Sequence, residues 1–266
     1  MADIISLKSF LEAGVHLGHQ TRRWHPQMKP YIYAAKQGIH IVDLRKTLHS
    51  LKDAYEYVKH ASAEGRDVLF VGTKPQIQKV VEQQAISSNS PYISFRWLGG
   101  MLTNFTTVRQ SINRYHEYEE LRGSDGTYPG VLKKEALVME SKRLKLEKSL
   151  GGVKNMKRPP SIMFVVDCKK EHIAIQEAKK LGMTIIALVD TNCAPGHIDF
   201  VIPGNDDAPR SVELITSVIA RAVKEGKAMR AAATGISEIE QEIPAEPALP
   251  EPENVETEIE SESEDE

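Results

Sequence analysis

The chain has 266 residues, of which 41% are hydrophobic and 27% charged, as is ordinary for a globular protein with a sizeable core. No apolar run approaches the roughly 18 residues that span a lipid bilayer. The N-terminal stretch carries Asp3 and Glu12, and it resembles neither a signal peptide nor an arginine-rich transit peptide. We therefore expect a cytoplasmic protein that does not span a membrane.

The formal charge of −3 conceals an asymmetry along the chain. Residues 236–266 hold 13 of the 37 acidic residues and no Lys or Arg, which leaves 24 acids against 34 bases in residues 1–235. A basic body of this kind indicates an anionic partner such as nucleic acid or a membrane surface, unless its charges are scattered and only solvate the protein. The Glu-, Pro- and Ser-rich end predicts a disordered acidic tail over 234–266.

Short hydrophobic runs alternate with helical patterns along most of the chain. The runs predict strands over 67–74, 91–97, 161–167, 184–190 and 198–204. The helical patterns cover 43–64, 75–87, 170–181 and 208–231. This alternation predicts an α/β domain built on a parallel sheet, formed by 1–100 and 158–233 and including an N-terminal extension.

A long connection within 101–157 interrupts this alternation. Apolar positions recur there at heptad-like spacing on two helices, and "GSDGTYPG" (123–130) supplies a turn between them. The positions are Phe105, Val108, Ile112 and Tyr115, then Leu132, Ala136, Met139, Arg143, Leu146 and Leu150. We predict a protruding antiparallel helical hairpin, a coiled coil inserted into the α/β domain.

The stretch "GVHLGHQTRRWHP" (14–26) raises the question of a metal site. His16, His19 and His25 offer three imidazoles, a conceivable zinc set. The spacing is not that of an HExxH motif, and Arg22 and Arg23 beside it oppose the binding of a cation. We therefore expect no metal, with these three histidines as the lesser alternative. Cys168 and Cys193 lack CxxC spacing and are expected to be buried and inert.

Two features leave an enzyme open as an alternative. Asp167 and Asp190 each end a predicted strand, where α/β folds bind ligands, although such residues more often cap a turn or helix. "VGTKP" (71–75) places Lys74 between a strand and a helix without the spacing of a phosphate-binding loop. An α/β nucleotide- or phosphate-binding enzyme is the runner-up hypothesis, and a protein that binds partners through its hairpin or tail is a third.

Basic residues interleaved with aromatic rings favour RNA. Lys and Arg neutralise phosphates, and rings and guanidinium groups stack on unpaired bases. The basic residues of the second hairpin helix are equally compatible with a solvated face, because glutamates are interspersed among them. The predicted RNA-binding set is His16, His19, Arg22, Arg23, Trp24, Lys29, Lys36, Lys74, Arg96, Asn104, Arg109, Lys154, Lys157 and Arg158.

Five segments, in order across roughly residues 5–230, together resemble one family. They are "GVHLGHQTRRWHPQMKPYI", "FVGTK", "WLGGMLTNF", "SLGGVKNM" and "DFVIPGNDDAPRS". Each is modest alone, but the set is similar to the bacterial small-subunit ribosomal protein two family. The resemblance implies a three-layer, flavodoxin-like parallel sheet of strand order 2-1-3-4-5 that carries a protruding two-helix coiled coil.

The same resemblance implies function. Family members are structural components of the small ribosomal subunit. They contact ribosomal RNA and neighbouring ribosomal proteins, and they help to dock the large mRNA-binding protein of that subunit. The resemblance implies no catalysis, no cofactor, no membrane contact and no homo-oligomer.

Overall fold

The structure is a computed structural model that describes residues 6–123 and 126–242, with side chains as far as Gly235. The chain divides into two units, Met1–Ala231 and Ala232–Glu266. Within the described segments, no helix is both long enough and apolar enough to cross a bilayer.

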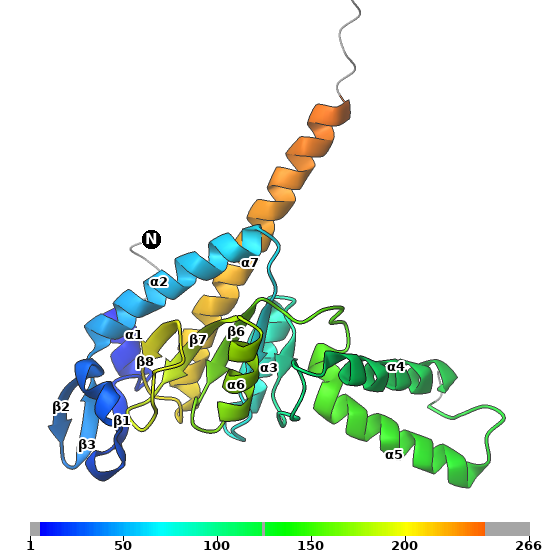
Figure 1. Cartoon of the computed structure of the whole chain (residues 1–266), viewed down its shortest axis with the longest axis horizontal. Helices are drawn as coiled ribbons and strands as arrows, with labels where there is room; N and C mark the ends of the chain where they lie inside the picture. The colour runs from blue at the N-terminus through cyan, green and yellow to red at the C-terminus, as the bar shows by residue number, and fades with distance from the viewer. Residues whose placement is uncertain (1–5, 124–125, 243–266) are drawn as a thin grey trace, which may run out of the picture. The chain divides into compact units, whose positions relative to one another are not determined.

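A five-stranded parallel sheet forms the centre of the first unit (Figure 1). Its strands are β4 (Val68–Val71), β5 (Tyr92–Ile93), β6 (Ile162–Val166), β7 (Thr184–Val189) and β8 (Phe200–Pro203), in the spatial order β5-β4-β6-β7-β8. Numbered along the chain, this is the order 2-1-3-4-5 that the family resemblance implies. Every adjacent pair is parallel, which confirms the predicted sheet.

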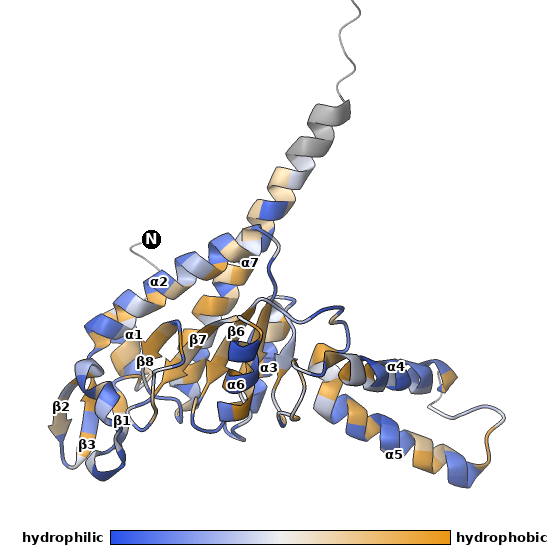
Figure 2. Ribbon diagram, viewed as in Figure 1, coloured by the Kyte–Doolittle hydropathy of each residue, from blue (hydrophilic) through white to orange (hydrophobic). Residues whose placement is uncertain are grey.

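Helices cover both faces of this sheet. On one face, Phe70, Phe164 and Ile186 pack with α2 (Leu44–Ala63), α3 (Gln78–Ser87) and α7 (Pro209–Glu242). On the other, Leu69, Met163 and Ile185 pack with α6 (His172–Lys180) and the base of the hairpin. Successive residues of each strand therefore enter opposite cores, which explains why the strands are hydrophobic throughout (Figure 2).

One predicted strand is much shorter than expected. The hydrophobic run 91–97 yields only β5, which is an edge strand that pairs with β4 alone. After Ile93 the chain leaves the sheet, and Trp97, Met101 and Leu102 pack into the core that α6 also covers. The apolar character that predicted a long strand therefore belongs partly to a buried loop.

The predicted hairpin consists of α4 (Phe105–Leu121) and α5 (Lys133–Leu150), which pack side by side (Figure 1). A short 3-10 helix, η3 (Gly151–Val153), follows α5. Ile112, Tyr115 and Leu150 are buried, as the heptad spacing predicts, whereas Leu132, which precedes α5, is 72% exposed and does not follow it. Arg143 is also buried, at 4% exposure, and its guanidinium binds Glu119, Glu140 and Glu147.

The N-terminal extension forms a second, antiparallel sheet that the sequence reading missed. After α1 (Leu7–Glu12) come β1 (Leu17–Gln20), the 3-10 helices η1 (Thr21–Arg23) and η2 (Pro26–Tyr31), and then β2 (Ile32–Lys36) and β3 (Ile39–Val42). The sheet order is β1-β3-β2. Gln37 and Gly38 both have positive φ, as a tight hairpin between β2 and β3 requires.

The boundary of the acidic tail also differs from the expectation. Disorder was predicted from residue 234, but α7 continues to Glu242, so residues 234–242 are helical. Ala231, Ala232 and Ala233 lead into this stretch and are strong helix formers. The rest of the predicted tail, 243–266, lies outside the described residues.

Candidate nucleic-acid interface

The small antiparallel sheet and the 3-10 helices beside it present basic and aromatic side chains to solvent. Exposed residues of the predicted set are Arg22, Arg23, Trp24, Lys29 and Lys36, while His16 is half-buried. Trp24 packs against the ring of His40 with 5.4 Å between centroids, which leaves 37% of Trp24 exposed. The segment thus offers four exposed cations and one partly exposed indole ring.

Close packing holds this segment against the parallel-sheet domain. A Cβ on Gly18 would lie 2.8 Å from the methyl group of Thr191, so only glycine permits the approach. The backbone amide of His25 donates to the carbonyl of Thr191 at 2.7 Å. Met28 is fully buried in the core that includes β6 and β7. The exposed cations therefore lie on a segment that is packed firmly against the parallel-sheet domain.

Five further predicted cations and Asn104 lie around the base of the hairpin. Arg96, Asn104, Arg109, Lys154, Lys157 and Arg158 are all exposed. Asn104 precedes α4 and accepts a hydrogen bond from the hydroxyl of Thr107 at 2.9 Å. In the described part of the chain, no ion pair involves Arg96, Arg109 or Lys157, so their charges face solvent.

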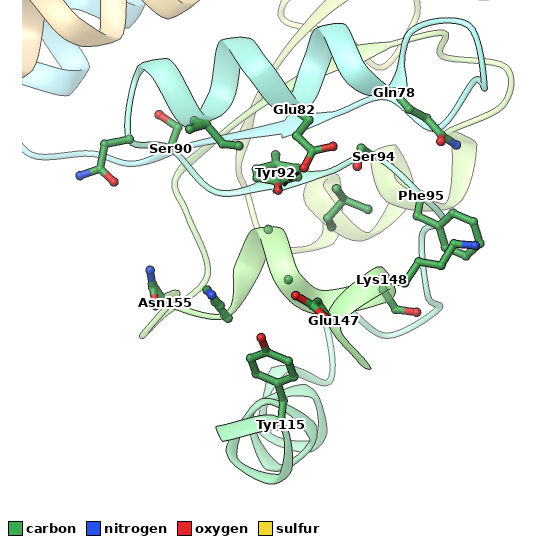
Figure 3. Close-up of a pocket in the computed structure, with 17 residues that line it drawn as sticks. Gln78, Glu82, Ser90, Tyr92, Ser94, Phe95, Tyr115, Glu147, Lys148 and Asn155 are labelled. Atoms are coloured by element: carbon green, nitrogen blue, oxygen red, sulfur yellow. Dashed lines mark hydrogen bonds between the residues drawn. The ribbon is translucent and has the colours of Figure 1, made fainter. Parts of the chain in front are cut away.

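A groove of about 600 Å³ opens between α3, β5 and the end of α5 (Figure 3). Lys148 lies over the ring of Phe95, 4.1 Å from its centroid, and Phe95 is 40% exposed. Tyr115 points into the groove, and Lys154 lies 5.8 Å from its ring. Neither Phe95 nor Lys148 belongs to the RNA-binding set predicted from the sequence. The sequence feature that could have identified Phe95 is an aromatic ring followed directly by a cation, Arg96.

Lys74 does not share in this exposed surface. Its ammonium lies 2.8 Å from Asp167, 2.7 Å from Asp206 and 2.9 Å from Asp207, at the carboxyl edge of the parallel sheet. Burial would lower the pKa of Lys74, but these carboxylates outweigh it and raise the pKa. Three carboxylates already bind this ammonium inside the protein, so these contacts do not favour the assignment of Lys74 to RNA, which stays a prediction.

His19 is turned toward the same edge. Its Nδ1 lies 2.8 Å from the carboxylate of Asp190, and its Nε2 lies 3.0 Å from the amide of Asn192 and 3.5 Å from Asp207. The hydrogen bond with Asp190 is the main cause of a raised pKa for His19. Both nitrogens of its ring have partners within the protein, so the assignment of His19 to RNA also stays a prediction that these contacts do not favour.

The three histidines of the alternative zinc set do not converge. Among the described residues, two clusters have donor atoms close enough to share an ion, and neither contains His16 or His25. His25 instead caps η2, because its Nδ1 accepts from the amide of Gln27 at 3.3 Å. Of the three histidines, only His19 belongs to either cluster.

The groups of the enzyme alternative are occupied by structural contacts. Asp167 accepts from the amides of Lys169 and Lys170, as a capping residue does. In the "VGTKP" loop, the amide and hydroxyl of Thr73 both donate to Glu171. The backbone amide that a phosphate would use thus already has a partner.

Comparison with known proteins points the same way as the exposed basic surface. Residues 10–226 match the family described as ribosomal protein S2. The chain is 54% identical over 222 residues to small ribosomal subunit protein uS2 of Geotalea uraniireducens (strain Rf4), covering 84% of this chain and 86% of that protein. It is 50% identical over 230 residues to small ribosomal subunit protein uS2 of Thermobifida fusca (strain YX), covering 86% and 79%. The chain therefore belongs to the ribosomal protein S2 family, which is not a family of enzymes.

Proposed function

We propose that this chain is a structural component of the small ribosomal subunit that binds ribosomal RNA through two exposed basic surfaces. The first, the N-terminal surface, consists of Arg22, Arg23, Trp24, Lys29 and Lys36, with His16 at its border. The second, the hairpin-base surface, consists of Arg96, Asn104, Arg109, Lys154, Lys157 and Arg158. Family membership and the names of the relatives support the ribosomal assignment.

The contrast between internal and exposed cations carries the RNA assignment. Lys74 and Arg143 each bind three carboxylates inside the protein. By contrast, within residues 6–123 and 126–235, no cation of the two surfaces forms an ion pair. Exposed Arg and Lys side chains without an ion pair are available to neutralise phosphates. The counterions that they release from the RNA favour binding.

The exposed rings add contacts that do not depend on charge. Trp24 and Phe95 are 37% and 40% exposed, and each lies beside a cation of the two surfaces or of the adjoining groove. An unpaired base stacked on such a ring contributes about 1 to 3 kcal/mol. Single-stranded or bulged nucleotides, rather than a regular duplex, are the expected partners of these two side chains.

Sedimentation of a tagged full-length chain from growing cells tests the assignment. We expect it to co-migrate with the small subunit and to dissociate as salt is raised, since phosphate contacts weaken with salt. A triple variant with Arg22, Arg23 and Lys29 changed to Ala should shift toward the top of the gradient. Lys52→Ala removes an exposed charge from α2 and serves as the control. A chain found only at the top of the gradient at every salt concentration contradicts the proposal.

Docking of the large mRNA-binding protein is the finer part of this proposal. The family resemblance supports it, and the hairpin offers apolar side chains suited to a protein partner. Leu137 and Leu144 are 73% and 50% exposed on α5. Subunits carrying Leu137→Ser with Leu144→Ser should retain this chain but lose the large protein. Full retention of both proteins would remove the hairpin from that role.

A further inference from the structure

The groove beside the base of the hairpin is built from separate parts of the chain that are packed tightly together. Its walls come from α3, from β5 with the residues after it, and from the end of α5 with η3 (Figure 3). A Cβ on Gly152 of η3 would lie 2.7 Å from the ring of Tyr92 and closer still to its carbonyl, so only glycine permits this approach. The hydroxyl of Tyr92 donates to Glu82 of α3 at 2.8 Å. The walls are therefore fixed to one another, and the groove is preformed.

The charges that line the groove favour an anionic ligand. Both of its carboxylates already have partners, because Glu147 pairs with Arg143 at 2.9 Å and Glu82 accepts from a tyrosine hydroxyl. Its two lysines, Lys148 and Lys154, are exposed. Within residues 6–123 and 126–235, neither lysine forms an ion pair with a carboxylate. Both ammonium groups are therefore available to a phosphate.

Phe95 adds a flat apolar surface beside these charges. The ammonium of Lys148 lies 4.1 Å from the centroid of its ring, and 40% of Phe95 remains exposed. A nucleobase is a planar group that stacks on such a ring, and the cation next to it suits the phosphate of the same nucleotide. The groove encloses about 600 Å³, which is the size of a site for one small ligand and far too small for a double helix.

Two carboxamides in the groove are suited to the edge of a base. Asn89 and Asn155 both line it. Among the residues that the structure describes, neither side-chain amide has a hydrogen-bond partner. A carboxamide offers an acceptor oxygen and two donor hydrogens, which complement the polar edge of an unpaired base. Phosphate, ring and base edge thus each have a matching group in one groove.

We propose that this groove binds one unpaired nucleotide of the small-subunit ribosomal RNA, with its base stacked on Phe95. Asn155 binds the edge of the base, while Lys148 and Lys154 contact the phosphates on either side. This inference rests on the proposed RNA binding, to which it adds a contact that depends on a base and not on charge alone. Lys154 lines the groove and also belongs to the hairpin-base surface, so a strand bound on that surface passes the groove.

Short synthetic strands of equal charge test the proposal with the full-length chain. One strand is a ribose-phosphate chain that is abasic throughout, and the others carry a single base at the centre, each of the four in turn. Filter binding at low salt measures their affinities. We expect the preferred base to bind about tenfold or more tightly than the abasic strand, because stacking on an aromatic side chain contributes on that order. Phe95→Leu removes the ring but keeps an apolar side chain, so it should abolish the difference, and Phe95→Trp should restore it. Asn155→Ala should reduce the advantage of the preferred base, and an unchanged preference refutes the role given to that amide.

A matched control and a parallel measurement make each failure informative. Ile173→Ala removes an apolar side chain of similar exposure, 44%, from α6 outside the groove, and it should leave the difference unchanged. The proposal is overturned if the abasic strand binds as tightly as the others, if Phe95→Leu keeps the difference, or if Ile173→Ala abolishes it. If the chain binds ribosomal RNA in a salt-dependent way but fails these tests, only the groove is refuted, whereas a chain that binds no RNA refutes the proposed function itself. Equal binding of all strands, together with loss of a neighbouring protein from subunits that carry Phe95→Leu, would assign the groove to a protein partner instead.

Discussion

The carboxylate of Glu177 on α6 lies 3.1 Å from the indole nitrogen of Trp97 and accepts its hydrogen bond. The same carboxylate accepts from the backbone amides of Gly100, Leu102 and Thr103 and from the hydroxyl of Thr103. This loop leads directly into α4. One buried side chain therefore positions the base of the hairpin, where the hairpin-base surface lies.

Replacing Glu177 by Ala should destabilise the protein by about 3 kcal/mol or more, because several buried donors lose their acceptor together. Urea unfolding of the full-length chain gives the free energy. Gln176→Ala, the exposed neighbour on the same helix, should change it by less than about 0.5 kcal/mol. A loss of under about 1 kcal/mol for Glu177→Ala would show that the loop is held by its apolar packing alone.

Acid should act through the same carboxylate. Burial opposes the charge on Glu177, but the hydrogen bonds outweigh it and lower the pKa below the ordinary 4.5. A carboxyl whose pKa is lower in the folded state stabilises the fold above about pH 4.5, and this contribution is lost as pH falls through the folded-state pKa. The stability difference between the native chain and Glu177→Gln should therefore shrink between about pH 5 and pH 3. A constant difference over this range would refute the lowered pKa.

The sequence was informative wherever one local rule governs a segment. Runs that are apolar at every position predicted β6 and β7, because both faces of the sheet are covered, and heptad spacing predicted α4 and α5. The small N-terminal sheet was not predicted, since the residues of its strands are mostly exposed or only partly buried and alternate poorly. The turn at Gln37 and Gly38, both with positive φ, is the local feature that marks the hairpin between β2 and β3.

Side-chain partners were less predictable than the fold. Lys74 and His19 read as RNA ligands because their neighbours in sequence are basic or glycine-rich. Among their partners in the structure, Asp190, Asp206 and Asp207 lie over 130 residues away in the chain. Only the topology, which brings the carboxyl ends of β4, β6, β7 and β8 to one edge, places these groups together.

Arg143 should stabilise the hairpin despite its charge. It fills a heptad position at 5% side-chain exposure and binds three glutamates, and the bond to Arg143 is the main cause that lowers the pKa of Glu140 to about 2. Arg143→Ala leaves a gap and unpaired carboxylates, at an expected cost of about 1 to 3 kcal/mol. Hydrogen exchange of amides in α4 and α5 measures this locally. Lys142→Ala, an exposed change on the same helix, should leave exchange unaltered, and equal effects of the two variants would contradict the role of Arg143.

Two glycines of α7 should respond in opposite ways to the same substitution. At Gly226 a Cβ would lie 2.6 Å from the Cβ of Ser62 and close to the carbonyl of Lys59, so Gly226→Ala should destabilise by about 1 to 3 kcal/mol. At Gly235 nothing lies within 4 Å, so Gly235→Ala should only improve helix propensity, by up to about 1 kcal/mol. Thermal unfolding followed by circular dichroism compares them. Stabilisation by both changes would mean that α2 and α7 pack less closely than the structure shows.

Salt dependence should separate phosphate contacts from structural cations. Log affinity falls as log salt rises, and each phosphate contact that is lost reduces the magnitude of this negative slope by about one. For fragments of small-subunit ribosomal RNA, Arg22→Ala and Arg23→Ala should therefore each reduce the magnitude of the slope by about one, and the double variant by about two. A filter-binding titration at several salt concentrations measures the slope. Lys52→Ala should leave the slope unchanged. An unaltered slope in the double variant, with the fold intact by circular dichroism, would remove the N-terminal surface from the RNA interface and leave the hairpin base as the remaining candidate.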